Sequence, residues 1–180
     1  MLLYVDAQYA SPYAMSAFVA LHEKGIPFSI STVDLAAGVN QKSSYAATSL
    51  TQRVPTLVHE SFSLSESSAI AEYLNEVFPG QTLYPSDPKA RARARQVQAW
   101  LRSDLMPLRQ ARSTEVIFYG PIDQPLSGAA TLAADKLVRV AGALLAHEHD
   151  NLFGSWCIAD LDLALMLNRL VFNGEAPSHR

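Results

Sequence analysis

The first part of the chain alternates between short apolar runs and amphipathic stretches. Leu2 to Asp6 is an apolar run of strand-forming residues. Ser11-Pro12 then supplies an N-cap residue and a proline at the first helical position, ahead of apolar residues at helical spacing, and Gly25 ends that helix. Residues 27–33 alternate apolar and polar positions, which is typical of a half-buried strand. The pattern therefore predicts a strand, a helix and a second strand, the unit that forms parallel strands.

The next segments predict a loop, a hairpin and a helix. Residues 36–52 are small and polar with little periodicity, so we expect a loop with a short irregular helix. Residues 55–58 and 61–64 predict two antiparallel strands, with the two-residue turn at 59–60. Ser65 is predicted to cap the helix that follows.

After a proline-rich stretch the pattern becomes helical and shows no further strand signal. We therefore predict one domain over residues 1–80, a linker over 81–87 and a helical domain over 88–180. A helix from Lys89 to about Phe118 should be kinked at Pro107, and a second should run from Leu126 to about His149. The third, from Ile158 to Phe172, is apolar on most sides and is the predicted core of this domain.

Composition narrows the class of protein. Hydrophobic residues make up 49% and charged residues 17% of the chain, as in ordinary globular proteins. A net charge of −3 offers no basic field for nucleic acid or an anionic membrane. The single cysteine, Cys157, excludes an internal disulfide framework and favours a reducing compartment. Asp6 interrupts the apolar start, no basic segment precedes it, and no run approaches the roughly 20 apolar residues of a spanning helix. We expect a cytoplasmic protein that binds small molecules.

The candidate chemistry begins where the first strand meets the first helix. A Cys-x-x-Cys pair at this place in such a unit would indicate a dithiol redox site, but the two sulfur positions hold Ser11 and Ala14. What remains is a hydroxyl at the positive end of a helix, where an anion is favoured. Such a site suits a thiolate brought by another molecule. The alternative is that Ser11 is only an N-cap.

Two further motifs carry weaker signals of their own. Pro55 begins a strand, where proline is sometimes cis, and a cis bond would leave the Val54 backbone ready to pair with an extended peptide. The alternative is a plain turn proline. Glu66-Ser67 opens a helix with a carboxylate, a hydroxyl and exposed amides, which could bind an amino acid zwitterion. The alternative here is a serine-rich N-cap. The five histidines lack paired ligand spacing, so no metal site is predicted.

Together these motifs resemble the glutathione S-transferase family, and within it most closely the bacterial YfcF type. The resemblance covers nearly the whole chain and rests on Ser11-Pro12-Tyr13, Arg53-Val54-Pro55, Leu64 to Leu74, Arg91 to Pro107, and Asn151 to Val171. It implies a thioredoxin-like N-terminal domain followed by an all-helical C-terminal domain. The family usually continues with further helices, so the C-terminal domain is expected to be shortened and its core helix partly uncovered. Cys157 stands where the family commonly has a Ser or Thr helix cap, which lowers the expected local stability.

The resemblance also implies roles for individual residues. Ser11 occupies the position of the residue that hydrogen-bonds the glutathione sulfur, and is the expected catalytic residue. The residue before the cis proline pairs with the cysteinyl backbone of glutathione, and a Glu-Ser pair holds its γ-glutamyl end, which assigns binding to Val54, Pro55, Glu66 and Ser67. Candidates for the glycyl carboxylate are Gln41, Lys42 and Arg53.

The implied activity is transfer of glutathione, as cosubstrate, to small hydrophobic electrophiles, without a tightly bound cofactor. A glutathione-dependent peroxidase using the same thiolate and a non-catalytic binding module of the same fold remain alternatives. The resemblance further implies a homodimer.

Overall fold

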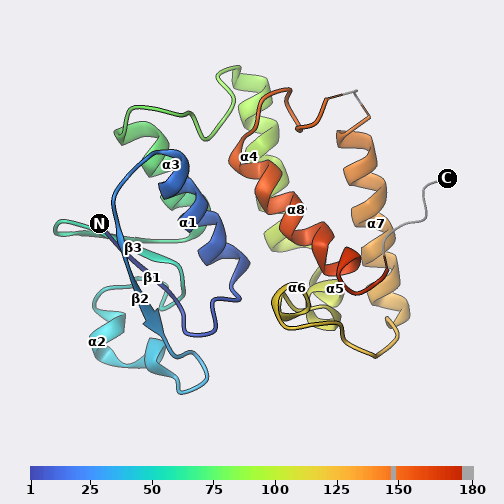
Figure 1. The fold of residues 1–180 in the computed structure, drawn as a ribbon, viewed down its shortest axis with the longest axis horizontal. Coiled ribbons are helices and arrows are strands. Elements are labelled where there is room, and N and C mark those ends of the chain that lie inside the picture. Colours follow the sequence, from blue (N-terminus) through green and yellow to red (C-terminus); the bar gives the residue numbers. More distant parts are fainter. Residues whose placement is uncertain (147–148, 176–180) are drawn as a thin grey trace. The chain divides into compact units, whose positions relative to one another are not determined.

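The computed structural model describes residues 1–146 and 149–175, and the chain forms two compact units, Met1–Leu83 and Tyr84–Arg180 (Figure 1). The first unit contains a four-stranded sheet in the order β2-β1-β3-β4. Strands β1 and β2 are parallel, whereas β3 is antiparallel to both β1 and β4. The four strands are β1 (Leu2–Asp6), β2 (Ser29–Val33), β3 (Thr56–His59) and β4 (Phe62–Ser65). This sheet confirms the predicted strand-helix-strand unit and the antiparallel hairpin.

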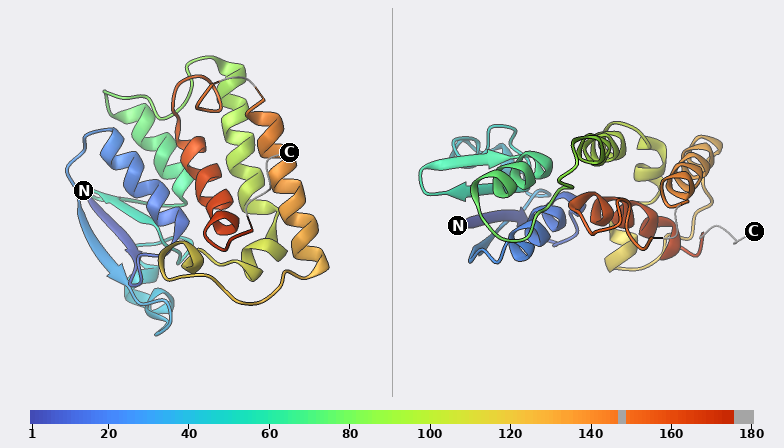
Figure 2. Two further views of the ribbon diagram at one scale, coloured as in Figure 1. Left: turned by 45° about the vertical axis from the view of Figure 1, so that its right-hand side comes forward. Right: turned by 90° about the horizontal axis from the view of Figure 1, so that it is seen from above.

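Two helices of the first unit lie together on one side of the sheet, as both views of Figure 2 show. They are α1 (Pro12–Glu23) and α3 (Ser67–Val77), which pack against each other. The buried side of α1 carries the small residues Ala14, Ala17 and Ala20, which let the helix approach its neighbours closely. Between β2 and β3 the chain forms a 3-10 turn, η1 (Val39–Gln41), and a short helix, α2 (Ser43–Ala46), in the segment where a loop with an irregular helix was predicted.

Two local predictions in this unit were wrong by one residue. His59 pairs with Phe62, so the hairpin turn is Glu60-Ser61 rather than 59–60. The strand extends through His59, whose ring nitrogen Nδ1 lies 2.7 Å from the Tyr73 hydroxyl, and Glu60 makes the turn with a φ of 56°. Ser65 does not cap α3, because it is the buried last residue of β4, paired with Thr56, and Glu66 is the N-cap.

Within the described residues the second unit is built from five helices. They are α4 (Pro88–Ser103), α5 (Met106–Ala111), α6 (Glu115–Phe118), α7 (Gly128–Leu144) and α8 (Ile158–Val171). The prediction of one kinked helix from 89 to 118 was wrong. Leu105 adopts a left-handed conformation with a φ of 62°, and Pro107 lies in the first turn of α5, where proline starts a helix instead of bending one. In the part of the chain that the structure describes, every helix is too short or too polar to span a bilayer.

The predicted core position of α8 is confirmed, since seven of its side chains are buried. Exposure near its C-terminal end is limited to Val171 and Phe172, so the expected uncovering of this helix does not extend to its core face. The first turn of α8 is held by Asp160, whose two carboxylate oxygens accept the backbone N–H groups of Leu152 at 2.7 Å and Cys157 at 2.8 Å. The reciprocal capping box is therefore formed, with the Cys157 side chain accepting the Asp160 N–H where a hydroxyl is usual.

A buried cation connects distant parts of the second unit. The Arg112 side chain is 2% exposed and pairs with the carboxylate of Glu175, which follows α8. Its guanidinium also donates to the Gln124 carbonyl at 2.7 Å, and the Arg112 carbonyl accepts from Arg169 at 2.7 Å. These bonds hold the end of α5 to the end of α8.

Candidate functional site

The register of the sheet brings three of the predicted motifs to one edge of the first unit. Tyr4 pairs with Thr56, and Thr56 pairs with Ser65. The loop that leaves β1, the residues that enter β3 and the residues that leave β4 therefore lie next to one another, with neighbouring strands about 4.8 Å apart. Ser11, Val54-Pro55 and Glu66-Ser67 belong to these three connections, so segments far apart in the sequence meet at one edge.

Ser11 is the N-cap of α1 and is half-buried. Its Oγ accepts a hydrogen bond from the Ala14 N–H at 3.2 Å, so the cap that the sequence predicts is formed. A hydroxyl that accepts a hydrogen bond still has its own proton to donate. The group is therefore able to cap the helix and donate to an anion at the same time, and the two interpretations of Ser11 do not exclude each other.

The backbone around Ser11 limits what else could bind that anion. The Ser11 N–H donates to Asp6, the Ala14 N–H to Ser11 Oγ, and the Met15 N–H to the Ser11 carbonyl at 3.0 Å. Pro12 has no N–H. None of these four positions offers a backbone N–H to a ligand, so among them the Ser11 hydroxyl is the available donor.

Asp6 supports the loop that carries Ser11, and sequence reasoning missed it. Its side chain is buried, with 4% of the residue exposed. Oδ2 accepts the Ala10 N–H at 2.7 Å and Oδ1 accepts the Ser11 N–H at 3.0 Å. The available signal was a lone carboxylate at the end of an otherwise apolar strand, which we used only as evidence against a signal peptide.

The entrance to β3 contains the cis peptide bond Val54-Pro55, and a cluster of hydroxyls surrounds the carbonyl just before it. The Tyr45 hydroxyl donates to the Arg53 carbonyl at 3.0 Å, and the hydroxyl oxygens of Ser49 and Thr56 lie 3.2 and 2.9 Å from the same atom. Burial raises the pKa of the Tyr45 hydroxyl, so it stays a donor at neutral pH. The cluster fixes α2 to the start of β3, in a segment whose sequence showed little periodicity.

The remaining predicted residues differ in exposure. Glu66 is exposed and has a φ of 75°, whereas Ser67 is buried at the first position of α3. Gln41, Lys42 and Arg53 are exposed. The side chain of Asn40 donates to the Gln52 carbonyl at 3.0 Å, which brings the segment containing Gln41 and Lys42 beside Arg53.

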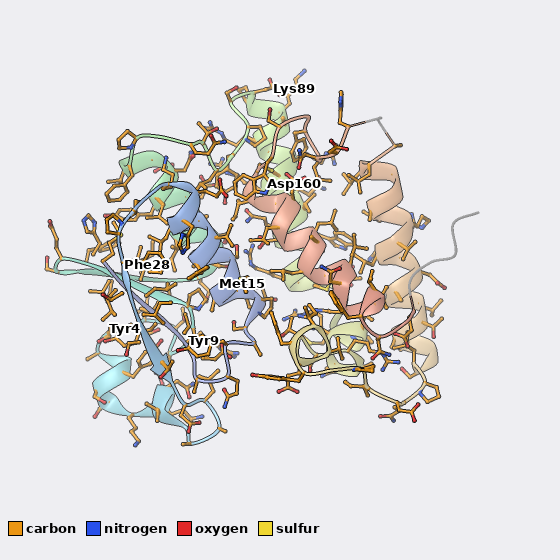
Figure 3. All side chains as sticks on the ribbon, viewed as in Figure 1. Tyr4, Tyr9, Met15, Phe28, Lys89 and Asp160 are labelled. Carbon is orange, nitrogen blue, oxygen red and sulfur yellow. The ribbon has the colours of Figure 1, made fainter. Side chains whose placement is uncertain are left out.

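A pocket of about 140 Å³ opens beside Ser11, entirely within the first unit. Figure 3 labels two residues of its wall, Tyr9 in the loop after β1 and Met15 on α1. Its polar groups come from Asp6, Tyr9 and Ser11, and the described lining contains no lysine or arginine. The lining residues are Val5, Asp6, Tyr9, Ser11, Ala14, Met15, Phe18 and Ile30.

Outside this pocket, the described residues include neither a metal-binding cluster nor a reactive thiol. Within residues 1–146 and 149–175, no cluster of three His, Cys, Asp or Glu side chains is arranged to hold a metal ion. Burial, followed by the nearby charge of Asp160, raises the pKa of the Cys157 thiol to about 12. Cys157 is therefore an unreactive core residue.

Comparison with known families matches both units. Residues 10–77 match the family described as "Glutathione S-transferase, N-terminal domain", and residues 87–180 match "Glutathione S-transferase, C-terminal domain". A solved structure of a glutathione transferase homologue from Burkholderia, with bound glutathione, is 50% identical. It superposes with a TM-score of 0.75 over 94% of this chain and 80% of that one.

Curated relatives match shorter regions. Glutathione S-transferase U28 of Arabidopsis thaliana is 39% identical over 90 residues, which is 48% of this chain and 38% of the relative. Maleylacetoacetate isomerase of Pseudomonas aeruginosa is 38% identical over 114 residues, which is 62% of this chain and 53% of the relative. The matched regions thus span about half of these relatives or less.

Proposed function

The chain belongs to the glutathione S-transferase family, and we propose that it transfers glutathione to small, uncharged apolar electrophiles, with the Ser11 hydroxyl stabilising the glutathione thiolate. The observation that carries this proposal is the meeting of three motifs at one sheet edge, each suited to a different part of glutathione. Glutathione bound to the homologous Burkholderia structure supports the choice of cosubstrate.

In this proposal each part of the peptide has its own partner. The cysteinyl backbone pairs with Val54, next to Pro55, and the γ-glutamyl end binds Glu66 and Ser67. The Ser11 hydroxyl then donates to the sulfur at the positive end of α1, where the helix dipole also favours the thiolate. The glycyl carboxylate is left for the exposed residues Gln41, Lys42 and Arg53. The activated sulfur attacks an electrophile whose position the bound peptide fixes.

The pocket beside Ser11 supports an uncharged apolar electrophile. Most of its wall is aliphatic or aromatic, and it adjoins the hydroxyl that would hold the sulfur. The buried carboxylate of Asp6 disfavours a second anion in the same pocket. A neutral aromatic or alkyl group therefore suits this wall better than a carboxylate-bearing one.

Isomerisation is a second candidate, because isomerases are among the relatives. Maleyl compounds carry carboxylates, and the residues that line the pocket include no lysine or arginine that could bind a carboxylate. The two candidates are separated by comparing conjugation of a neutral aromatic electrophile with isomerisation of maleylpyruvate at equal glutathione. Reduction of an organic hydroperoxide in the same experiment tests the peroxidase alternative.

Three finer predictions accompany this function. We propose a homodimer, because Phe62 on the edge strand β4 and Val77 on α3 are 48% and 51% exposed. The cytoplasmic location and the membership of the YfcF type remain predictions from the sequence.

The test is a calorimetric titration of glutathione into the protein and into Glu66→Gln, which removes the charge and keeps the side-chain shape. We expect affinity to fall about tenfold or more, because a charge-assisted hydrogen bond to the glutathione ammonium is lost. The control is Glu76→Gln, an exposed glutamate of the same helix, which makes the same change in net charge. Absence of glutathione binding to the unchanged protein, or an equal loss in both variants, would contradict the proposal.

A further inference from the structure

We propose that Asp6 is a positioning residue that aligns the Ser11 hydroxyl with the glutathione sulfur. This inference rests on the proposed function and concerns the same site. Asp6 does not touch the sulfur in this proposal. It acts through the backbone N–H groups of Ala10 and Ser11, which its carboxylate binds.

The loop that Asp6 holds is short and turns back on itself. After β1, the Ala7 N–H donates to the Val33 carbonyl at 3.0 Å and the Tyr9 N–H donates to the Asp6 carbonyl at 3.1 Å. Tyr9 itself adopts a left-handed conformation with a φ of 54°, which turns the chain back toward the end of β1. These backbone bonds secure the first half of the loop, and the Asp6 carboxylate secures the second half, where Ser11 lies.

A carboxylate suits this place because both of its oxygens only accept hydrogen bonds. The two N–H groups belong to consecutive residues, and each receives its own oxygen at 2.7 and 3.0 Å. An asparagine of the same shape has one accepting oxygen and one NH2 group, so one of the two backbone donors would face another donor. Asp6→Asn therefore releases one attachment of the loop and leaves the size of the side chain unchanged.

The position of the hydroxyl depends on this attachment. Ser11 has extended backbone angles, with φ −73° and ψ 118°, and its N–H is bound on one side while its Oγ caps α1 on the other. Releasing the N–H lets the residue rotate, so the hydroxyl spends less time directed at the sulfur. The buried charge of Asp6 acts in the opposite sense, because a negative group near the site disfavours a thiolate.

These two effects differ in sign, which makes the proposal testable. The experiment measures the apparent pKa of glutathione bound to the protein from the ultraviolet absorbance of its thiolate, for unchanged protein, Asp6→Asn, Ser11→Ala and the double variant. We expect Asp6→Asn to raise this pKa by about half a unit to one unit, a fraction of the effect of a whole hydrogen bond to an anion. In the Ser11→Ala background the same change should not raise it further.

The matched control is Asp34→Asn. Asp34 lies directly after β2, and Asp6 is the last residue of β1. The Oδ1 of Asp34 also accepts a backbone N–H, that of Ala37 at 2.9 Å, but this hydrogen bond lies on the exposed surface. It should leave the pKa of bound glutathione unchanged. Asp6→Glu keeps the charge but displaces the carboxylate, so it should also raise the pKa of bound glutathione. This variant separates the effect of geometry from that of charge, and it serves as a second test if Asp6→Asn does not fold.

The outcomes are distinct. A lowered pKa that persists in the Ser11→Ala background would show that Asp6 acts only as a charge, and an unchanged pKa in both Asp6→Asn and Asp6→Glu would show that it does not position Ser11; either result overturns the inference. If Ser11→Ala raises the pKa while both Asp6 variants leave it unchanged, the proposed function survives and the inference fails. If Ser11→Ala itself has no effect, the proposed role of Ser11 fails and the inference fails with it.

Discussion

Ser11 and Ser127 form a natural pair for testing whether Ser11 does more than cap a helix. Each is an N-cap whose Oγ accepts the N–H of the residue three positions later at 3.2 Å, from Ala14 in α1 and from Ala130 in α7. Replacing either serine with alanine removes the same hydrogen bond at the start of a helix. We expect each variant to lose about 1 kcal/mol of the free energy of unfolding.

Only Ser11→Ala should change the chemistry of glutathione. A hydrogen bond to a charged group contributes about 1.5 to 3 kcal/mol, which corresponds to roughly 1 to 2 pKa units of the thiol. A free thiol has a pKa of about 8.5, and this bond together with the helix dipole would lower the value to about 6.5. The pKa of bound glutathione should therefore rise to about 8 in Ser11→Ala and stay unchanged in Ser127→Ala.

The assay is the rate of transfer to a neutral aromatic electrophile as a function of pH, at saturating glutathione. At pH about 6.5 half of the thiol is ionised when its pKa is 6.5, but only a few per cent when it is 8, so Ser11→Ala should be slower by about tenfold or more. Because the variant has the higher pKa, its deficit should shrink as pH rises above 8. Equal stability losses with identical pH profiles in the two variants would refute the reasoning, and Ser11 would then be a cap alone.

Three other changes have defined outcomes. Asp160→Asn leaves one of two buried backbone donors without an acceptor, so the free energy of unfolding from urea denaturation should fall by about 2 kcal/mol or more. The pKa of the Cys157 thiol should also fall below about 12. A loss of stability under about 0.5 kcal/mol would contradict this role of Asp160. Hydrogen bonding to Lys136 lowers the pKa of Asp104 to about 2. The ionised Asp104 therefore contributes stability, below about 1 kcal/mol at this exposed site, that is present above pH 4 and lost as pH falls through about 2. Asp104→Asn should remove that part of the dependence of stability on acid pH, and an unchanged dependence would argue against the pair. Phe62→Ser should shift the protein from dimer to monomer in sedimentation experiments, whereas a dimer of unchanged affinity would exclude this surface.

Local signals allowed much of the first unit to be predicted. Ser11-Pro12 marks the start of α1 because a cap and an N-terminal proline act within one turn, and Leu2–Asp6 was predicted with its observed bounds. The break before α5 could not be found in this way. Leu105 is buried and left-handed there, a conformation that packing imposes against the preference of leucine.

The site also combines features that local motifs predict with features that depend on the fold. Ser11, Val54-Pro55 and Glu66-Ser67 were proposed from short motifs, but their meeting at one edge depends on the pairing of three strands. Asp6 and the hydroxyls around the Arg53 carbonyl were missed because their partners lie in the fold and have no spacing pattern in the chain. The motifs proposed residues that would contact a ligand, whereas the residues that hold those motifs in place could be found only in the structure.

The buried pairing of Arg112 with Glu175 sets a practical boundary for protein engineering. Trimming the chain from its C-terminal side to a point before residue 175 would remove the carboxylate and leave a guanidinium, 2% exposed, without its counter-charge. Losing one partner of a fully buried ion pair typically costs about 3 to 5 kcal/mol, and the cost here should be smaller because Glu175 is 27% exposed and Arg112 keeps the Gln124 carbonyl as an acceptor. Tags and fusion partners should therefore be attached beyond Glu175, and deletion libraries of this helical unit should treat that residue as their limit.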